Sequence, residues 1–180
     1  MARHLHPAHA RQVRLKRLAE NIDSLLEKDE SLLRRTREIG ELRRTAAAEL
    51  HVVCAEFVKA LNGLLERSIV DLDPQEYSPA SFREEASNLI QINVRGRILQ
   101  IEFRATPELV STEDFRIPYT LEGTIHAFNQ ELLDKDLIEE QLIFFTLESH
   151  RKMWRFFDAR TYRSGPFEVE YLIGLMEQLI

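Results

Sequence analysis

Residues 18–60 read LAENIDSLLEKDESLLRRTREIGELRRTAAAELHVVCAEFVKA, and every seventh residue of this stretch is apolar. The repeated positions are Leu18, Leu25, Leu32, Ile39, Ala46, Val53 and Ala60. No proline occurs between Pro7 and Pro74. A seven-residue repeat without helix breakers predicts one very long helix, or two helices that share a seam. Such an element rarely fits inside a small domain, so the repeat indicates a binding partner.

The helical stretch changes character near Thr45. Before it, a narrow apolar stripe is flanked by charged residues, which is typical of a helix that pairs with another helix. The stripe consists of Leu15, Leu18, Ile22, Leu25, Leu32 and Ile39. From Ala46 to Leu65, apolar residues surround most of the helix, which predicts burial against a sheet. We therefore expect a basic, heptad-patterned helical extension over 1–44 and an α+β domain over 45–180, with its buried helix at 45–68.

Three polar residues interrupt the second apolar line of the heptad repeat. Asp29, Thr36 and Arg43 stand where apolar residues are expected, and Gly40 lies among them. These residues weaken a long coiled coil and allow a turn between two shorter helices. At this stage the extension is either one long helix or a helical hairpin, and the interruptions are where the helix is expected to bend, end or change its contacts.

The segment 88–162 predicts an antiparallel sheet of about five or six strands. A two-residue turn at Arg95-Gly96 would place the apolar residues of both flanking strands on one face. The predicted pairs are Val94 with Arg97, Ile92 with Leu99 and Ile90 with Ile101. Further strands are predicted at 115–120, 124–128, 141–147 and 153–160. The segment 129–138 is either a short helix or a loop.

A linker at 71–87, which contains Pro74 and Pro79, precedes the sheet, and a helix at 166–180 follows it. The segregation of helices and strands predicts an α+β fold with a long N-terminal helix or helical hairpin, the antiparallel sheet and a C-terminal helix. This order of elements is similar to that of small acidic dimeric secretion chaperones. The long basic N-terminal helix departs from their pattern, and no motif residue supports the resemblance.

The first 17 residues are basic. Arg11, Arg14, Lys16 and Arg17 precede the first acid, Glu20, so this basic arm could bind nucleic acid or an acidic partner. A second basic cluster at 34–44 has acids interleaved at helical spacing, which is typical of a solvated face. The net charge of −6 argues against a dedicated nucleic-acid binder.

Other candidate residues have simpler structural interpretations. Three histidines at positions 4, 6 and 9 could bind a metal ion, but no cysteine or acid lies near to complete a ligand set. Further residues with reactive or titratable side chains are Cys54 with His51, the carboxylates Asp71, Asp73 and Glu76, and the scattered His126 and His150. An aromatic set, which forms a core or a binding groove, consists of Phe144, Phe145, Trp154, Phe156 and Phe157.

No phosphate-binding loop, CxxC pair, HExxH or GxSxG pattern occurs in the sequence, so no catalytic or cofactor-binding residue is assigned, and no cofactor or metal is expected.

The leading hypothesis is a non-enzymatic interaction or regulatory module that forms a homodimer or higher oligomer through its N-terminal helices. Another protein is a further possible partner. Alternatives are a nucleic-acid-associated protein that uses the basic arm, and an enzyme or small-ligand binder with a site on the sheet. A single cysteine, the lack of a secretory signal and the lack of a long apolar run lead us to expect a cytoplasmic protein without a membrane partner.

Overall fold

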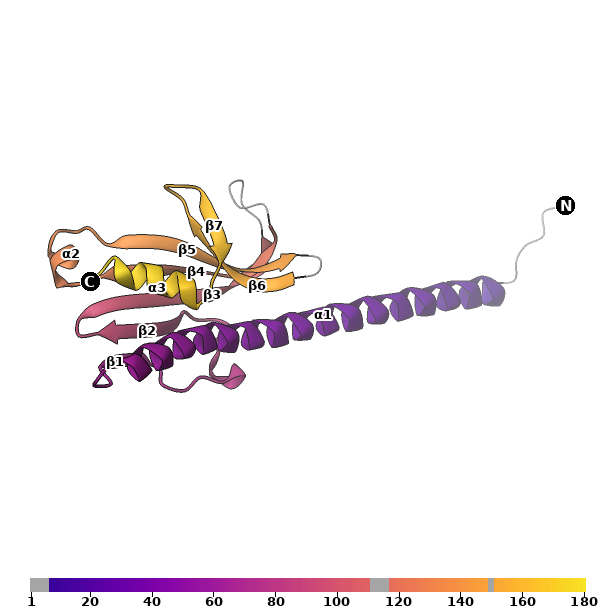
Figure 1. Cartoon of the computed structure of the whole chain (residues 1–180). Coiled ribbons are helices and arrows are strands. Elements are labelled where there is room, and N and C mark those ends of the chain that lie inside the picture. The colour runs from indigo at the N-terminus through magenta and orange to yellow at the C-terminus, as the bar shows by residue number, and fades with distance from the viewer. Residues whose placement is uncertain (1–6, 111–116, 149–150) are drawn as a thin grey trace. The chain divides into compact units, whose positions relative to one another are not determined.

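The computed structural model describes residues 7–110, 117–148 and 151–180. The elements are α1 (Pro7–Leu64), β1 (Val70–Asp73), a 3-10 turn η1 (Pro79–Ser81), β2 (Asn88–Val94), β3 (Arg97–Val110), β4 (Tyr119–Phe128), α2 (Gln130–Asp134), β5 (Glu139–Glu148), β6 (Arg151–Asp158), β7 (Arg163–Pro166) and α3 (Val169–Glu177). Figure 1 colours them in chain order. The predicted α+β class, with a long N-terminal helix, an antiparallel sheet and a C-terminal helix, is confirmed. Within the described residues the sheet has seven strands, slightly more than predicted.

The N-terminal element is one helix, because α1 runs unbroken from Pro7 to Leu64. The hairpin alternative is therefore not found. Asp29 and Thr36 are exposed on the helix, where polar side chains are readily tolerated. Contacts divide the chain into two compact units, Met1–Gly40 and Glu41–Ile180, which are described separately below.

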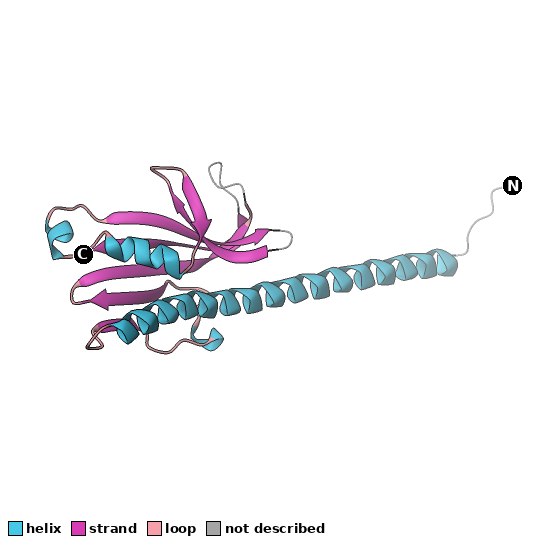
Figure 2. Cartoon of the chain, viewed as in Figure 1, coloured by secondary structure: helices cyan, strands magenta, loops and turns pink. Residues whose placement is uncertain are grey.

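Neighbouring strands pair antiparallel in the order of the chain, from β1 to β7 (Figure 2). The predicted β2–β3 hairpin has the predicted register, since Val94 pairs with Arg97 and Ile90 with Ile101. Arg95 and Gly96 both have positive φ, 51° and 88°, as a tight hairpin turn requires. The backbone N–H of Gly96 donates to Oδ1 of Asn93 at 2.8 Å, which closes the turn.

Four predicted boundaries are wrong, three of them because short strands and a short turn lie in segments that were assigned to the linker or to the C-terminal helix. The predicted linker 71–87 includes most of β1 and η1, and the predicted sheet 88–162 extends to strands on both sides of it. The predicted helix 166–180 forms only at Val169–Glu177, because Pro166 belongs to β7. Likewise, the helix predicted at 45–68 ends at Leu64.

The strand predicted at 124–128 and the end of the strand predicted at 115–120 belong to a single strand, β4, which begins at Tyr119; residues 115 and 116 lie outside the described residues. Gly123 does not end this strand; it lies inside it, where a Cβ would be 2.2 Å from the carbonyl oxygen of Glu102. The ambiguous segment 129–138 contains the short helix α2, whose first turn is capped by Asn129.

In the unit 41–180, α1 and α3 cover the same face of the sheet. Buried α1 residues at helical spacing enter a core shared with the strands and α3: Ala46, Ala47, Leu50, Cys54 and Phe57. Val52 is 51% exposed and Leu64 87%, so the predicted burial around most of the helix is wrong. A helix that rests on a sheet is covered on one side only.

Two aromatic contacts join the helices to the sheet. The indole N–H of Trp154 donates to the carbonyl oxygen of Ala46 in α1 at 2.7 Å. Phe156 stacks on Tyr171 of α3, with ring centroids 4.1 Å apart. The β6 aromatic residues thereby fix the covered face of the sheet.

Candidate functional site

The unit Met1–Gly40 carries an exposed row of apolar side chains, which we call the leucine stripe. It contains the predicted residues Leu15, Leu18, Ile22, Leu25, Leu32 and Ile39. Together with Val13, Leu26 and Leu33, these side chains are between 38% and 66% exposed. Val13 lies on the other side of the helix at this spacing. The remaining eight exposed apolar side chains form an unusual surface for a folded chain, and such surfaces mark interaction sites.

Sequence reasoning missed Leu26 and Leu33 as members of this surface. Each directly follows a stripe leucine, and at about 100° per residue both fall on the side next to the seam. The seven-residue spacing between Leu26 and Leu33 is the signal in the sequence that could have identified them. They widen the stripe from two to three positions per heptad, which is typical of helices that pack against more than one neighbour.

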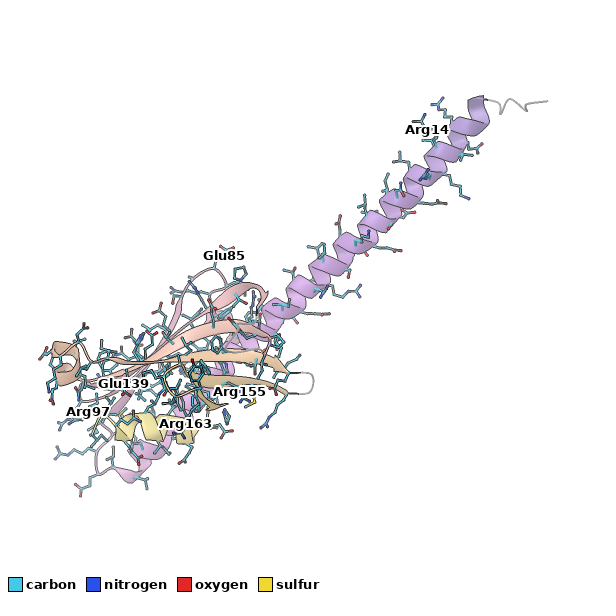
Figure 3. All side chains as sticks on the ribbon, turned by 90° about the horizontal axis from the view of Figure 1, so that it is seen from above. Arg14, Glu85, Arg97, Glu139, Arg155 and Arg163 are labelled. Carbon is cyan, nitrogen blue, oxygen red and sulfur yellow. The ribbon has the colours of Figure 1, made fainter. Side chains whose placement is uncertain are left out.

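The basic arm also lies on α1, and Arg11, Arg14, Lys16 and Arg17 are all exposed. Figure 3 shows Arg14 projecting from the helix. At helical spacing, Arg11, Arg14 and Arg17 follow one another at three-residue intervals on one side of the helix, and Lys16 lies nearly opposite Arg14. The predicted histidines at positions 4 and 6 lie outside the described residues, and position 9 falls within α1.

Arg43, one of the predicted interruptions, is buried and binds the sheet. Its Nε donates to Oγ1 of Thr120 at 2.8 Å, and its two other nitrogens donate to Glu84 and to the carbonyl oxygen of Thr106. The guanidinium therefore joins α1 to the ends of β3 and β4 and to the segment before β2. A heptad position that looks defective for helix pairing is in fact a contact with the sheet.

The surroundings of Cys54 and His51 indicate structural roles for both residues. Complete burial of Cys54 raises the pKa of its thiol to about 12, so the reactive thiolate is disfavoured. His51 is also buried; its Nε2 lies 2.7 Å from the carbonyl oxygen of Pro74, and its ring stacks on Tyr77. These contacts hold the segment after β1 against α1.

The remaining titratable candidates are not brought together. His126 alternates with the core residues Ile125 and Ala127, so it faces the opposite side of the sheet from α1 and His51. There its Nε2 lies 2.7 Å from a carboxylate oxygen of Glu140. Residue His150 lies outside the described residues.

The carboxylates Asp71, Asp73 and Glu76 are exposed at and after β1. Across the ranges that the structure describes, no three His, Cys, Asp or Glu side chains cluster as a metal ion would require. Over the same ranges, no helix has the length and apolar character to cross a membrane.

A cavity of about 420 Å³ lies on the sheet face opposite α1. Tyr119, Leu142 and Phe144 form its apolar wall. Its charged rim includes Arg104 and Glu122, which form an ion pair at 3.0 Å. The predicted aromatic set is therefore split, since Phe144 and Phe157 lie on this face and the other three aromatic residues lie on the covered face.

Comparison with known proteins gives no relative from which a role could be transferred: no protein-family model, no curated protein and no solved structure matches the chain. The candidate surfaces must therefore be judged on their own chemistry.

Proposed function

We propose that the protein is a non-enzymatic interaction or regulatory module that homo-oligomerises through the leucine stripe. The carrying observation is the row of eight large apolar side chains on residues 15–39, each exposed by more than a third. Burying such a side chain contributes roughly 1.5–3 kcal/mol, so a partner that covers the row would gain a large association free energy.

A second copy of the chain is the simplest partner, because each copy presents the same stripe. The third apolar position, supplied by Leu26 and Leu33, supports a bundle of several helices over a two-helix coil. Single helices are marginally stable in water, so helix pairing would also stabilise the unit 1–40 itself.

The test measures the mass of the full chain by sedimentation equilibrium. In the test variant, Leu25→Gln and Leu32→Gln remove two stripe side chains and should produce a monomer. In the matched control, Glu20→Gln and Glu27→Gln alter the opposite side of the same helix and should leave the oligomer intact. A wild-type chain that stays monomeric at about 100 μM would contradict the proposal, since a functional self-association should have a Kd below that range.

A second candidate function is binding to nucleic acid through the basic arm, and the exposure of all four of its side chains favours it. The expected behaviour is binding whose affinity falls steeply with salt. Replacing Arg11, Arg14, Lys16 and Arg17 by alanine should abolish this binding. Unchanged affinity in that variant would exclude the arm as the binding element.

A further inference from the structure

We propose that a cavity beside α2 is a docking site for a basic, leucine-bearing peptide segment of a partner protein. The cavity, called the α2 cavity here, has a volume of about 550 Å³. It is lined by Ala127, Leu132, Asp136, Leu137, Ile138, Glu139, Gln141, Asp158, Arg160, Gln178 and Leu179. Figure 1 shows that α2 lies next to the C-terminal end of α3. This site is independent of the leucine stripe and of the oligomer proposed above.

Apolar side chains form the walls of the α2 cavity and continue outside it. Leu137 and Ile138 line the cavity, and Leu137 is 57% exposed. Leu133 on α2 and Ile180, which follows Leu179 of the cavity lining, are exposed as well. An apolar surface that extends beyond the cavity fits an extended or helical peptide better than a small molecule, which would fill the cavity alone.

The charge around this surface is negative. Asp136, Glu139 and Asp158 line the cavity, and Glu131 and Asp134 lie on α2. Figure 3 shows Glu139 at the end of the sheet where α2 lies. Charge complementarity therefore favours a partner segment that carries Lys or Arg beside its apolar residues.

Lys135 at the end of α2 and Arg160 in the cavity lining are paired with acids. Lys135 bonds to Glu131 at 2.5 Å, and Arg160 lies 3.5 Å from Glu139 and 3.8 Å from Asp158. Asp136 and Asp134 thus leave the surface with an excess of negative charge. An acidic peptide would meet these carboxylates and be repelled.

A polar group in the cavity can bind the backbone of a bound segment. The hydroxyl of Tyr171 donates to Oε1 of Gln141 at 2.6 Å, which fixes the side-chain amide in one orientation. Among the described residues, no bond from the Gln141 amide nitrogen is found, so its N–H groups can donate to a peptide carbonyl.

The frame of the cavity is held by local hydrogen bonds at both ends of α2. The N–H of Leu132 donates to Oδ1 of Asn129 at 2.9 Å. At the other end, the N–H of Leu137 donates to the carbonyl oxygen of Leu132 at 2.8 Å, and Asp136 has a positive φ of 54°. This is the Schellman arrangement of a helix end. A preformed frame lowers the entropy that is lost when a segment binds.

The test uses a fluorescent synthetic peptide of 14 residues, made of Leu at helical spacing and Lys at the other positions, titrated with the full chain. We expect saturable binding that weakens by about tenfold when the ionic strength rises from roughly 50 to 500 mM. The same peptide with Glu in place of Lys should not bind. Absence of binding up to about 1 mM chain would overturn the proposal.

Protein variants then locate the site. Leu137→Ser combined with Asp136→Asn should weaken binding at least about tenfold, as loss of central contacts does in peptide interfaces. The matched control, Leu89→Ser with Glu102→Gln, makes the same kinds of change at exposed positions of the opposite sheet face and should leave affinity unchanged. Equal losses in both variants, or complete displacement of the peptide by spermidine, would overturn the assignment.

A third variant guards against a folding artefact. Leu137→Met keeps an apolar side chain of similar size and should retain binding. Thermal unfolding of each variant, followed by circular dichroism, must show the wild-type transition before its affinity is compared. Because the stripe variant Leu25→Gln, Leu32→Gln leaves the α2 cavity intact, it should bind the peptide as the wild type does. Failure of oligomerisation and failure of peptide binding are thus separate results.

Discussion

Arg43 shows how one residue can change the role of a helix. It occupies a heptad position, yet its guanidinium is buried and binds Thr120, Glu84 and the carbonyl oxygen of Thr106. The helix residues that follow it pack on the sheet. A buried cation is costly unless it is hydrogen-bonded, and each of the three guanidinium nitrogens of Arg43 has a partner here.

Replacing Arg43 by Met should therefore destabilise the chain by about 2–3 kcal/mol, the cost of losing hydrogen bonds to a charged group. The free energy of unfolding in urea measures the effect. Arg44→Met, at the neighbouring half-buried position, is the control and should change stability by less than about 0.5 kcal/mol. Equal losses of unfolding free energy in the two variants would show that the Arg43 hydrogen bonds add no stability beyond that of a half-buried arginine.

Gly123 is required by a close approach between strands. A Cβ at this position would lie 2.2 Å from the carbonyl oxygen of Glu102 and 2.7 Å from Cβ of Phe103. Gly123→Ala should thus cost about 1–3 kcal/mol through displaced backbone. Gly63→Ala, in α1 with nothing within 4 Å of the new Cβ, should instead stabilise by up to about 1 kcal/mol. Thermal unfolding midpoints that move in the same direction in both variants would contradict this.

Asp158 should give stability a dependence on acid pH. Burial favours a higher pKa for its carboxyl, but hydrogen bonds from Arg160 and Thr161 and the charge of Arg160 outweigh it, so its pKa is lowered. A lowered pKa in the folded state means that the stabilisation is fully present above the ordinary value of about 3.9 and is lost as pH falls through the folded pKa.

Urea unfolding of Asp158→Asn and wild type should therefore differ most near pH 6–7. The difference should shrink as pH falls from about 4 to about 2. A difference that stays constant over this range would assign the effect of the substitution to packing instead of charge.

At the scale of elements, the β2–β3 hairpin could be predicted to the residue because two independent signals agree. Alternating apolar residues set the faces, and Arg95-Gly96 sets the turn, so only one register satisfies both. The strands β1 and β7 could not be predicted, since each has four residues and depends on its neighbour for pairing. Similarly, Gly123 resembles a strand end in sequence, whereas the contact that demands it comes from β3.

The hairpin turn offers a prediction at this scale. Gly96 has a φ of 88°, which side chains adopt only with strain, so Gly96→Ala should destabilise by about 1–2 kcal/mol. Arg95, at φ 51°, should accept Asn with a gain of a few tenths of a kcal/mol, because Asn tolerates this region best after Gly. Chemical denaturation of both variants checks the opposite signs; a loss at both positions would contradict the assigned turn.

At the scale of the whole molecule, a candidate site can be predicted from the sequence when its residues lie close together along the chain. The leucine stripe and the basic arm lie within one helix, so their spacing is visible in the sequence. The α2 cavity combines residues from Ala127 to Leu179, which only the folded sheet brings together. Leu132 and Leu137 lie within the segment 129–138, which the sequence left as a short helix or a loop, and the sequence could not place the acidic residues around them.

The division of the chain after Gly40 predicts the behaviour of truncated forms. Deletion of residues 1–40 should leave a chain that unfolds cooperatively with nearly the wild-type midpoint, because Arg43 and the buried face of α1 remain. Deletion of 1–44 should lower the midpoint by several degrees, at roughly 2–4 °C per kcal/mol in a domain of about this size. Scanning calorimetry separates the two. Identical midpoints would place the boundary at 44.

Because Cys54 is buried, the reactivity of its thiol reports local opening of the folded structure. Since this is the single thiol of the chain and it lies in the centre of the core, maleimide can reach it only when the helix lifts from the sheet. The labelling rate of the unmodified protein then measures the free energy of that opening at one defined point, without any substitution. If a bound partner or oligomerisation stabilises the fold, maleimide should label Cys54 more slowly.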